Sequence, residues 1–191
     1  MFAPVRTVAP AATPVSLIEA KAHLRVEVDA EDALITSLVQ AATDHLDGYT
    51  GLLGRALVTQ TWRQDFNDFT CKMRLPVKPV ASIASVTYYD GENQQQTLST
   101  DSYELLTDAG GPYIARKADE AWPSTKNRAA AVSVTFVAGS SAADVPAPIK
   151  AAILLLVGHL YHNREAVSSV DLTAVPMAVD ALIAPYRRQT L

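Results

Sequence analysis

The sequence has few of the residues that cross-link or anchor a small protein. It holds one cysteine, Cys71, among 191 residues, which excludes an internal disulfide and a zinc site made of four thiolates. Its longest purely apolar run, 151–158, is well short of the roughly 18 residues that span a membrane. The first fifteen residues lack the continuous apolar core of a secretory signal. We therefore expect a soluble protein in a compartment where a thiol stays free.

Positive charge is also scarce. The chain has 16 Lys and Arg against 20 Asp and Glu, a net charge of −4. Four basic residues stand against seven acidic ones in 1–56, eight against nine in 57–140, and four against four in 141–191. A surface that grips nucleic acid needs clustered Lys and Arg to displace phosphate counterions. Only Arg187-Arg188 is a concentrated positive feature, so specific nucleic-acid binding is not indicated.

Motifs for nucleophilic catalysis and for phosphate binding are missing. The chain has no Gly-x-Ser-x-Gly elbow, and Cys71 stands in an expected strand without a histidine context. The segment 51–55 has two glycines but lacks the Lys-Ser/Thr pair and the preceding strand of a phosphate loop. We expect it to end a helix and lead into the next segment. Nothing in these motifs requires an enzyme or a cofactor.

Two histidines and a glutamate form the arrangement that most resembles a metal site. His159, His162 and Glu165 are three residues apart, so they share one face of an expected helix and could meet a divalent metal. The zincin pattern instead spaces its histidines by four, with a glutamate between them as base. We therefore expect hydrogen bonds at a helix end, and we keep a metal-dependent hydrolase as an alternative. His23 and His45 are expected at the surface or at helix caps.

Aromatic residues suggest a second alternative, a carbohydrate- or peptide-binding module. Tyr88, Tyr89, Trp62 and Trp122 could form a stacking surface for sugars or bases. Aromatic side chains in small β modules usually fill the core and the turns. The binding function would need Tyr88, Tyr89 and Trp122 to be exposed together in one cleft.

The two ends of the chain predict helices. Prolines 4, 10 and 14 make 1–15 an extended, mobile arm, with order beginning at Ser16. Ser16 and Glu19 have the capping-box spacing for a helix over 17–24. Asp29 is expected to cap a longer helix whose apolar residues recur to Tyr49, with Gly51 as a stop. After the prolines at 146 and 148, helices are expected over 149–163 and 177–183.

Between these helices the hydrophobic period changes to that of strands. Short segments with strand composition, separated by Gly, Asp and Pro turns, fill 57–140. In 132–137, Val132, Val134 and Phe136 alternate with polar residues. The predicted fold class is α+β: a helical layer from 16–56 and 146–185, with a small all-β, sandwich-like module, 57–140, inserted into it. Residues 186–191 are expected to leave the body as a short extension after Pro185.

Nine blocks of residues resemble the head-tail connector (adaptor) proteins of tailed bacteriophages and of phage-derived gene transfer agents. They follow in order from about 16 to 188, so the resemblance covers most of the chain, although each block alone consists mostly of packing residues. The blocks are AKAHLRV (20–26), DALI (32–35), AA (41–42), QTW (60–62), LPVKPVASI (75–83), AWP (121–123), VPAPIKAAILLLV (145–157), HLYHNRE (159–165) and PMAVDALIAPYR (176–187).

The resemblance implies a structural protein without catalytic residues. Such connectors form a ring of about a dozen copies below the portal of a filled capsid, extend the DNA channel and provide the platform for the next connector or tail component. The inserted β module is typical of one branch of the family. The resemblance places the protein at the head-tail junction of a virion or phage-like particle, assembled in the bacterial cytoplasm.

Two segments are predicted to contact the neighbouring components of such a connector. In related adaptors the carboxyl-terminal segment reaches the portal, and an aromatic side chain and two arginines suit an interface. A long polar turn displayed from a rigid scaffold suits docking of the next component along the tail axis. The predicted portal contacts are Pro185, Tyr186, Arg187, Arg188 and Leu191, and the predicted tail-side loop is Asp90, Gly91, Glu92, Asn93, Gln94 and Gln95.

Overall fold

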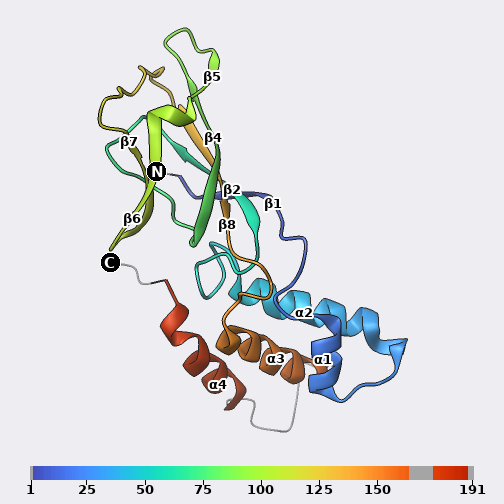
Figure 1. Cartoon of the computed structure of the whole chain (residues 1–191). Helices are drawn as coiled ribbons and strands as arrows, with labels where there is room; N and C mark the ends of the chain where they lie inside the picture. The colour runs from blue at the N-terminus through green and yellow to red at the C-terminus, as the bar shows by residue number, and fades with distance from the viewer. Residues whose placement is uncertain (1, 164–173, 189–191) are drawn as a thin grey trace. The chain divides into compact units, whose positions relative to one another are not determined.

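A computed structural model describes residues 2–163 and 174–188 of the chain (Figure 1). The chain forms two compact units. The β unit contains the residues up to Ala11 together with 59–140, and the helical unit contains 12–58 together with the segment that begins at Ser141. Glu165 and Leu191, which carry two of the sequence predictions, lie outside the described residues.

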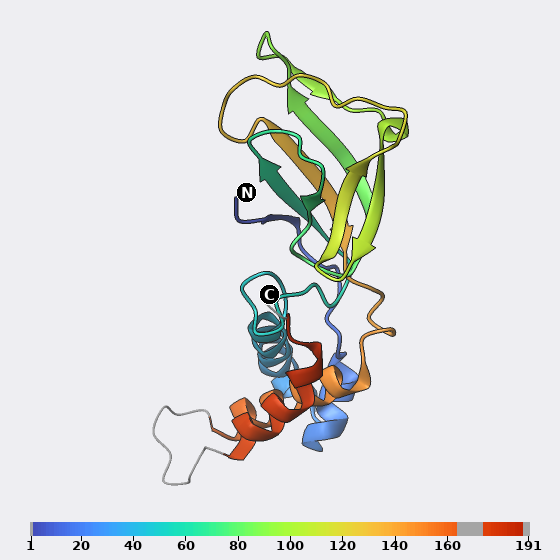
Figure 2. The ribbon, with the colours of Figure 1, turned by 90° about the vertical axis from the view of Figure 1, so that its left-hand side faces the viewer.

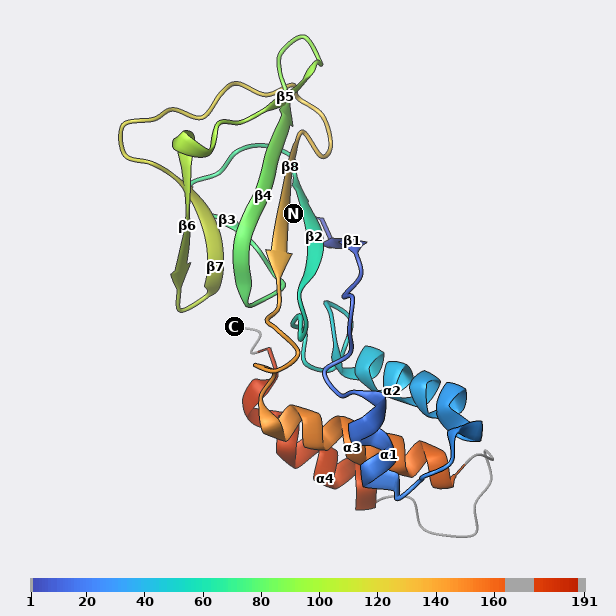
Figure 3. The same ribbon diagram turned by 45° about the vertical axis from the view of Figure 1, so that its right-hand side comes forward.

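The helical unit draws its helices from both ends of the chain. α3 packs against each of the other three α-helices (Figures 1 and 3). In the described residues the elements are α1 (Leu17–Leu24), the 3-10 turn η1 (Asp29–Glu31), α2 (Asp32–Leu46), α3 (Ala147–His162), α4 (Ala174–Ile183) and the 3-10 turn η3 (Ala184–Tyr186).

The predicted start of α1 is confirmed. The Ser16 hydroxyl accepts a hydrogen bond from the Glu19 backbone N–H at 3.2 Å. The Glu19 carboxylate in turn accepts one from the Ser16 backbone N–H at 2.7 Å. This reciprocal pair satisfies two donors that a helix start otherwise leaves free, which is why four residues of local sequence were enough to place it.

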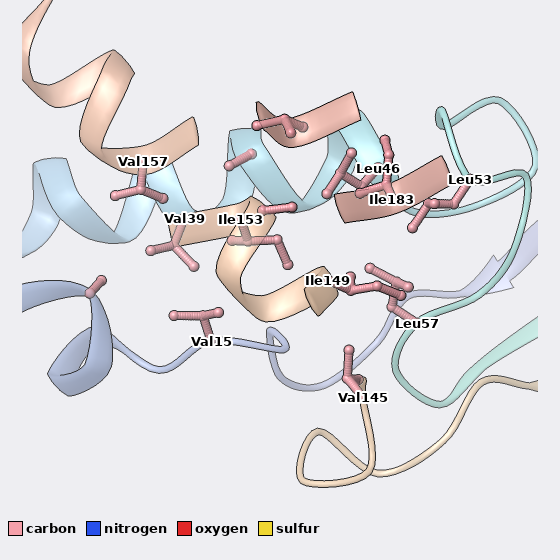
Figure 4. Packing of buried hydrophobic residues seen from close by; sticks show 14 of the residues in the cluster. Val15, Val39, Leu46, Leu53, Leu57, Val145, Ile149, Ile153, Val157 and Ile183 are labelled. Atoms are coloured by element: carbon pink, nitrogen blue, oxygen red, sulfur yellow. The ribbon is translucent and has the colours of Figure 1, made fainter. Parts of the chain in front are cut away.

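One apolar cluster holds the helical unit together (Figure 4). It excludes water from the facing sides of the helices, which is the main favourable contribution to their packing. The chain segments that flank α1 and follow α2 close its edges with Val15, Leu53 and Leu57. The buried helical members include Ile35, Val39 and Leu46 of α2, Ile149, Ile153 and Val157 of α3, and Val179 and Ile183 of α4.

The structure corrects both ends of the predicted second helix. Asp29 begins η1 instead of capping α2, and its carboxylate binds the Lys21 ammonium at 2.8 Å. α2 ends at Leu46, three residues before Tyr49. There the buried Asp47 turns its carboxylate to the Leu57 backbone N–H at 2.7 Å. Asp29 and Lys21 are 8 positions apart, and Asp47 and Leu57 are 10 positions apart. The spacing of apolar residues within one helix could not reveal either contact.

The β unit contains two antiparallel sheets (Figures 2 and 3). The five-stranded sheet has the order β1 (Val5–Val8), β2 (Gln60–Phe66), β8 (Val132–Ala138), β4 (Val80–Tyr89), β5 (Gln95–Thr97). The three-stranded sheet has the order β3 (Met73–Arg74), β7 (Gly111–Arg116), β6 (Tyr103–Asp108). A 3-10 turn, η2 (Thr100–Ser102), precedes β6.

The predicted alternation in β8 is confirmed. Val132, Val134 and Phe136 are buried, whereas Ser133 and Thr135 are only half-buried. Successive side chains of a strand point to opposite faces, so one face of the five-stranded sheet is apolar and the other is polar. The three-stranded sheet lies beside the apolar face (Figure 2) and adds the buried Met73 and Ile114.

The amino-terminal segment differs from the expected arm. Residues 5–8 form β1, which pairs antiparallel with β2 at the edge of the sheet, Val5 opposite Arg63 and Arg6 opposite Trp62. Order therefore begins before Ser16. All four side chains of β1 are exposed. Backbone hydrogen bonds hold this strand to the sheet, and such bonds cannot be predicted from the pattern of apolar residues. Cys71 also lies outside the strand expected there, because β3 begins at Met73.

The predicted fold class is confirmed by these elements. The structure is α+β, with helices from both ends of the chain and an all-β module between them in sequence. No helix in 2–163 or 174–188 combines the length and the hydropathy that crossing a membrane requires.

Candidate functional site

The predicted tail-side loop is the turn between β4 and β5, and one aspartate organises it. Asp90 Oδ1 accepts hydrogen bonds from the backbone N–H groups of Glu92 and Gln94, at 3.0 and 2.9 Å. Its Oδ2 accepts one from the Gln96 amide at 2.9 Å. Asn93 adopts a left-handed φ of 63°, which asparagine tolerates better than most residues. Gln95 is already the first residue of β5.

The tip formed by residues 90–95 is supported from a second segment of the β unit. The Arg128 guanidinium lies 4.0 Å from the centroid of the Tyr89 ring and donates to the Asn93 side-chain oxygen at 3.2 Å. The Lys126 backbone N–H donates to the Tyr89 carbonyl at 2.9 Å. Residues 91–95 are nevertheless exposed. The tip therefore presents a fixed backbone and exposed polar side chains, which suits recognition by a protein partner.

The electrostatics of the tip follow from the same contacts. The hydrogen bonds from the Gln96 amide and from the backbone of Gln94 and Glu92 hold the pKa of Asp90 below its ordinary value of 3.8. These donors stabilise the charged carboxylate more than the neutral acid. Asp90 is consequently ionised when the tip is folded, and its negative charge is bound by hydrogen-bond donors of the loop itself.

The carboxyl-terminal segment departs from the predicted free extension. Pro185 lies inside η3, and the half-buried Tyr186 packs against the apolar cluster of the helical unit. The Arg188 backbone N–H donates to the Leu53 carbonyl at 3.0 Å, and its guanidinium lies 5.3 Å from the Tyr49 ring centroid. Tyr186 and Arg188 are thus held by the chain itself, because a proline at the second position of a 3-10 turn does not force the chain away.

Arg187, like Pro185, is a predicted portal residue that stays exposed in the described segment. Its guanidinium pairs with the Asp180 carboxylate of α4, and both side chains are largely open to solvent. Such an exposed pair contributes little to stability, so the arginine is free to exchange partners. Leu191 lies outside the described residues.

The histidine arrangement gains no support as a metal site. His159 is half-buried, and its ring nitrogen Nδ1 lies 3.3 Å from the Asn163 amide. His162 is exposed and meets the Tyr161 ring edge to face. Among residues 2–163 and 174–188, no three His, Cys, Asp or Glu side chains gather closely enough to hold an ion, and Glu165 lies outside them.

The aromatic residues do not form the cleft that the binding alternative requires. Trp122 stacks on Phe69 with ring centroids 4.6 Å apart, and Tyr88 meets Phe69 edge to face at 5.6 Å. Tyr89 follows Tyr88 in β4 and therefore points to the opposite face of the sheet, where Arg128 covers its ring. Trp62 is buried. Most of these rings serve packing, as expected for a small β module.

Sequence reasoning missed an ion cluster at the β6–β7 turn. The Asp108 carboxylate binds the Arg74 guanidinium at 2.7 Å and the Lys72 ammonium at 2.8 Å. These two cations hold the pKa of Asp108 well below its usual range, Arg74 contributing more. The Tyr113 ring lies 4.8 Å from the Lys72 ammonium. The strand pairing of β3 with β7 brings the charges together, so no spacing in the sequence could have revealed them.

A hollow in the helical unit was also missed. It lies between α2 and α3, has a volume of about 270 Å³, and is lined by Ala41, Ala42, His45, Leu156 and Leu160. We call it the α2–α3 groove. Its lining is almost entirely apolar, yet Leu160 and Ala41 are exposed. In the sequence these residues look like ordinary members of two amphipathic helices.

Comparison with known proteins identifies what the chain resembles. Residues 14–106 match the family described as phage gp6-like head-tail connector proteins. The matched segment begins before α1 and ends inside β6, so it includes parts of both units. No curated protein sequence matches the chain.

Solved structures with the same fold come from gene transfer agent (GTA) particles. A chain from the virion of the native particle has a TM-score of 0.78 and 23% identity. Chains from the neck of the empty particle computed with C6 symmetry and of the native particle computed with C12 symmetry give TM-scores of 0.79 and 0.75, at 23% and 22% identity. Each comparison covers 100% of this chain and 97% of the other. At this level of identity the likeness establishes a shared fold over the full length.

Proposed function

We propose that the chain is a phage gp6-like head-tail connector protein, a structural protein and not an enzyme, because that family matches residues 14–106, and that it forms a ring in the neck of a phage-like particle. In this proposal about twelve copies surround the DNA channel below the portal. The ring extends the channel and offers a platform to the next connector or tail component.

The observation that carries this proposal is the fold likeness over the entire chain. The solved neck protein and this chain cover each other almost completely, so the likeness concerns the whole arrangement of helices and strands and not a single shared module. A shared fold alone does not establish a function, but here the family match concerns the same kind of particle component.

Charge supports a role around DNA without specific binding. The chain carries a net charge of −4, and a strongly basic lumen would bind a passing genome through counterion release. A weakly acidic wall repels the phosphate backbone and lets the DNA move. The cations Lys72 and Arg74 are paired with Asp108, which reduces the positive charge that the β unit presents.

We propose a partner for each of the two predicted contact segments. The supported tip, residues 90–95, is proposed to dock the next component on the tail side. The portal contact is proposed for the carboxyl-terminal segment, with Arg187 as its testable member, because Tyr186 and Arg188 are engaged within the helical unit. Neither a metal-dependent hydrolase nor a sugar- or peptide-binding module is favoured by an observation in the described residues.

Imaging of particles tests the proposal. Particles are prepared from cells that produce the full-length protein with an added epitope and from cells that lack it. We expect a labelled ring at the head-tail junction, and filled heads without tails when the protein is absent. Tailed, infectious or gene-transferring particles in its absence, or label elsewhere than at the junction, would overturn the proposal.

A further inference from the structure

The α2–α3 groove occupies one defined face of α3. Leu156 and Leu160 are four residues apart on α3, so they lie on the same side of the helix, and Ala41 and His45 of α2 are spaced in the same way. A cavity of about 150 Å³ is known to admit a benzene-sized group. The groove, at about 270 Å³, has room for a branched aliphatic side chain.

α1 lies on the opposite side of α3. Gly158 is two residues from both Leu156 and Leu160, and two helical steps turn a side chain by roughly 200°. A Cβ at Gly158 would stand 3.5 Å from the His23 ring nitrogen Nε2 of α1. α1 therefore covers the face of α3 that points away from the groove, and the helical unit has two opposed sides.

Ile18 projects from the α1 side. Ala20 of α1 is fully buried, and Ile18 stands two helical steps from it, so the Ile18 side chain points away from the core. Ile18 is 80% exposed, more than any other large apolar residue in the described part of the chain. Ala22, one turn further along, is exposed as well. The outer face of α1 thus presents a small apolar ridge.

The two sides also differ in the charge beside their apolar residues. Arg25, which caps the C-terminal end of α1 just beyond Ala22, is exposed. Asp44 of α2 lies one turn from Ala41 of the groove and is exposed; it accepts a hydrogen bond from Gln40 at 3.0 Å. The ridge side therefore offers a cation and the groove side offers an anion.

We propose that the helical units of neighbouring copies join by insertion of Ile18 of one copy into the α2–α3 groove of the next. This inference rests on the proposed ring. A closed ring of identical subunits needs two different, complementary surfaces on each subunit. The ridge and the groove are apolar, are opposite in local charge and lie on opposed sides of one unit, as a head-to-tail contact requires.

Engineered disulfides test the contact in particles assembled from full-length protein. In a Cys71→Ser background, the double variant Ile18→Cys with Ala41→Cys can link every copy to both neighbours. Under oxidising conditions we expect a ladder of covalent oligomers that extends towards the complete ring. A mixture of the two single variants can link each copy only once, so it should give dimers and no longer species.

Any other result of these cross-linking experiments would contradict the inference. If the single variant Ile18→Cys formed disulfide-linked dimers by itself, two copies of Ile18 would meet across a two-fold contact and not in the groove. A normal ring without a ladder would mean that something else covers the groove, for example residues 164–173 of the same chain; the proposed function would then stand. Absence of a ring in the Cys71→Ser parent and in the unaltered protein would overturn both.

A charge substitution provides an independent readout. Ile18→Asp puts a carboxylate into the groove of the neighbour, while in the separate subunit it lies exposed near the N-terminus of α1, where the helix dipole favours it. We expect an unchanged melting temperature and at least a tenfold loss of assembled rings. The matched control is Val28→Asp, another substitution of an exposed apolar residue (61%) outside the ridge, which should assemble normally. Normal assembly of Ile18→Asp would contradict the proposal.

Discussion

Asp90 shows how much one side chain can determine in an exposed loop. Replacing it with Ala removes the acceptor for two backbone N–H groups and the Gln96 amide. We expect the turn to loosen while the sheet stays folded, because the strands are paired elsewhere. Hydrogen exchange should speed up at the amides of Glu92 and Gln94. The neighbouring change Glu92→Ala, which removes no acceptor from this network, should leave these rates unaltered.

The same residue makes the order of the tip depend on pH. Its hydrogen bonds hold the pKa of Asp90 below 3.8 in the folded loop. A lowered pKa means that the contribution to stability is complete above the unfolded value, near 3.8, and is lost as the pH falls through the folded value. The exchange rates should therefore be constant from neutral pH down to about 4, after correction for intrinsic exchange. An Asp90→Asn variant should lack the acidic transition.

His159 and His162 are expected to be dispensable. Their observed contacts are a hydrogen-bond partner in Asn163 and the Tyr161 ring, so replacing both with Gln should cost about 1 kcal/mol in the free energy of unfolding. Particle assembly should remain near normal. Stoichiometric zinc in the native protein, together with loss of assembly upon chelation, would contradict this expectation.

Among the elements, η3 and its neighbours carry the clearest test of packing. Tyr186 packs against the apolar cluster, so Tyr186→Ala should lower the free energy of unfolding by roughly 1–3 kcal/mol. The matched variant Arg187→Ala removes an exposed ion pair and should change stability by less than about 0.5 kcal/mol. Urea unfolding of the two variants makes the comparison. Equal stabilities would mean that the Tyr186 ring contributes no packing.

The two variants also separate folding from portal binding. If Arg187 contacts the portal, Arg187→Ala should reduce retention of the protein on DNA-filled heads although it remains as stable as the unaltered chain. Deleting 186–191 cannot make this distinction, since it also removes Tyr186 from the helical unit. Wild-type retention of Arg187→Ala would place the portal contact elsewhere.

Elements defined by local signals were predictable from the sequence. The capping box at Ser16 and the alternation of β8 involve residues within a few positions of one another. The end of α2 depends on the contact of Asp47 with Leu57, and β1 depends on pairing with β2, more than fifty positions away. The α2–α3 groove similarly needs two helices to be packed before it exists. Where partners are distant in sequence, periodicity contains no information about them.

For the whole molecule, we expect changes in the tip to impair the joining of tails without impairing the filling of heads with DNA. We replace residues 90–94 with Asn-Gly, a two-residue turn that keeps Tyr89 opposite Gln95. Heads should fill and retain the protein, because the helical unit is unaltered, but they should join tails poorly. A matched change, Ala109→Asn in the exposed β6–β7 turn, should join normally. Equal tail joining by both variants would remove the tip from the docking surface.

The ends of the 59–140 segment meet at one point. The Thr59 backbone N–H donates to the Ser140 carbonyl at 2.9 Å, and the Thr59 hydroxyl donates to the same oxygen at 3.1 Å. A segment whose ends touch can be acquired, lengthened or lost during evolution in a single genetic event, since the chain on either side needs only a short splice. Selection can thereby remodel what the β unit presents to its surroundings without altering the residues that pack the helical unit.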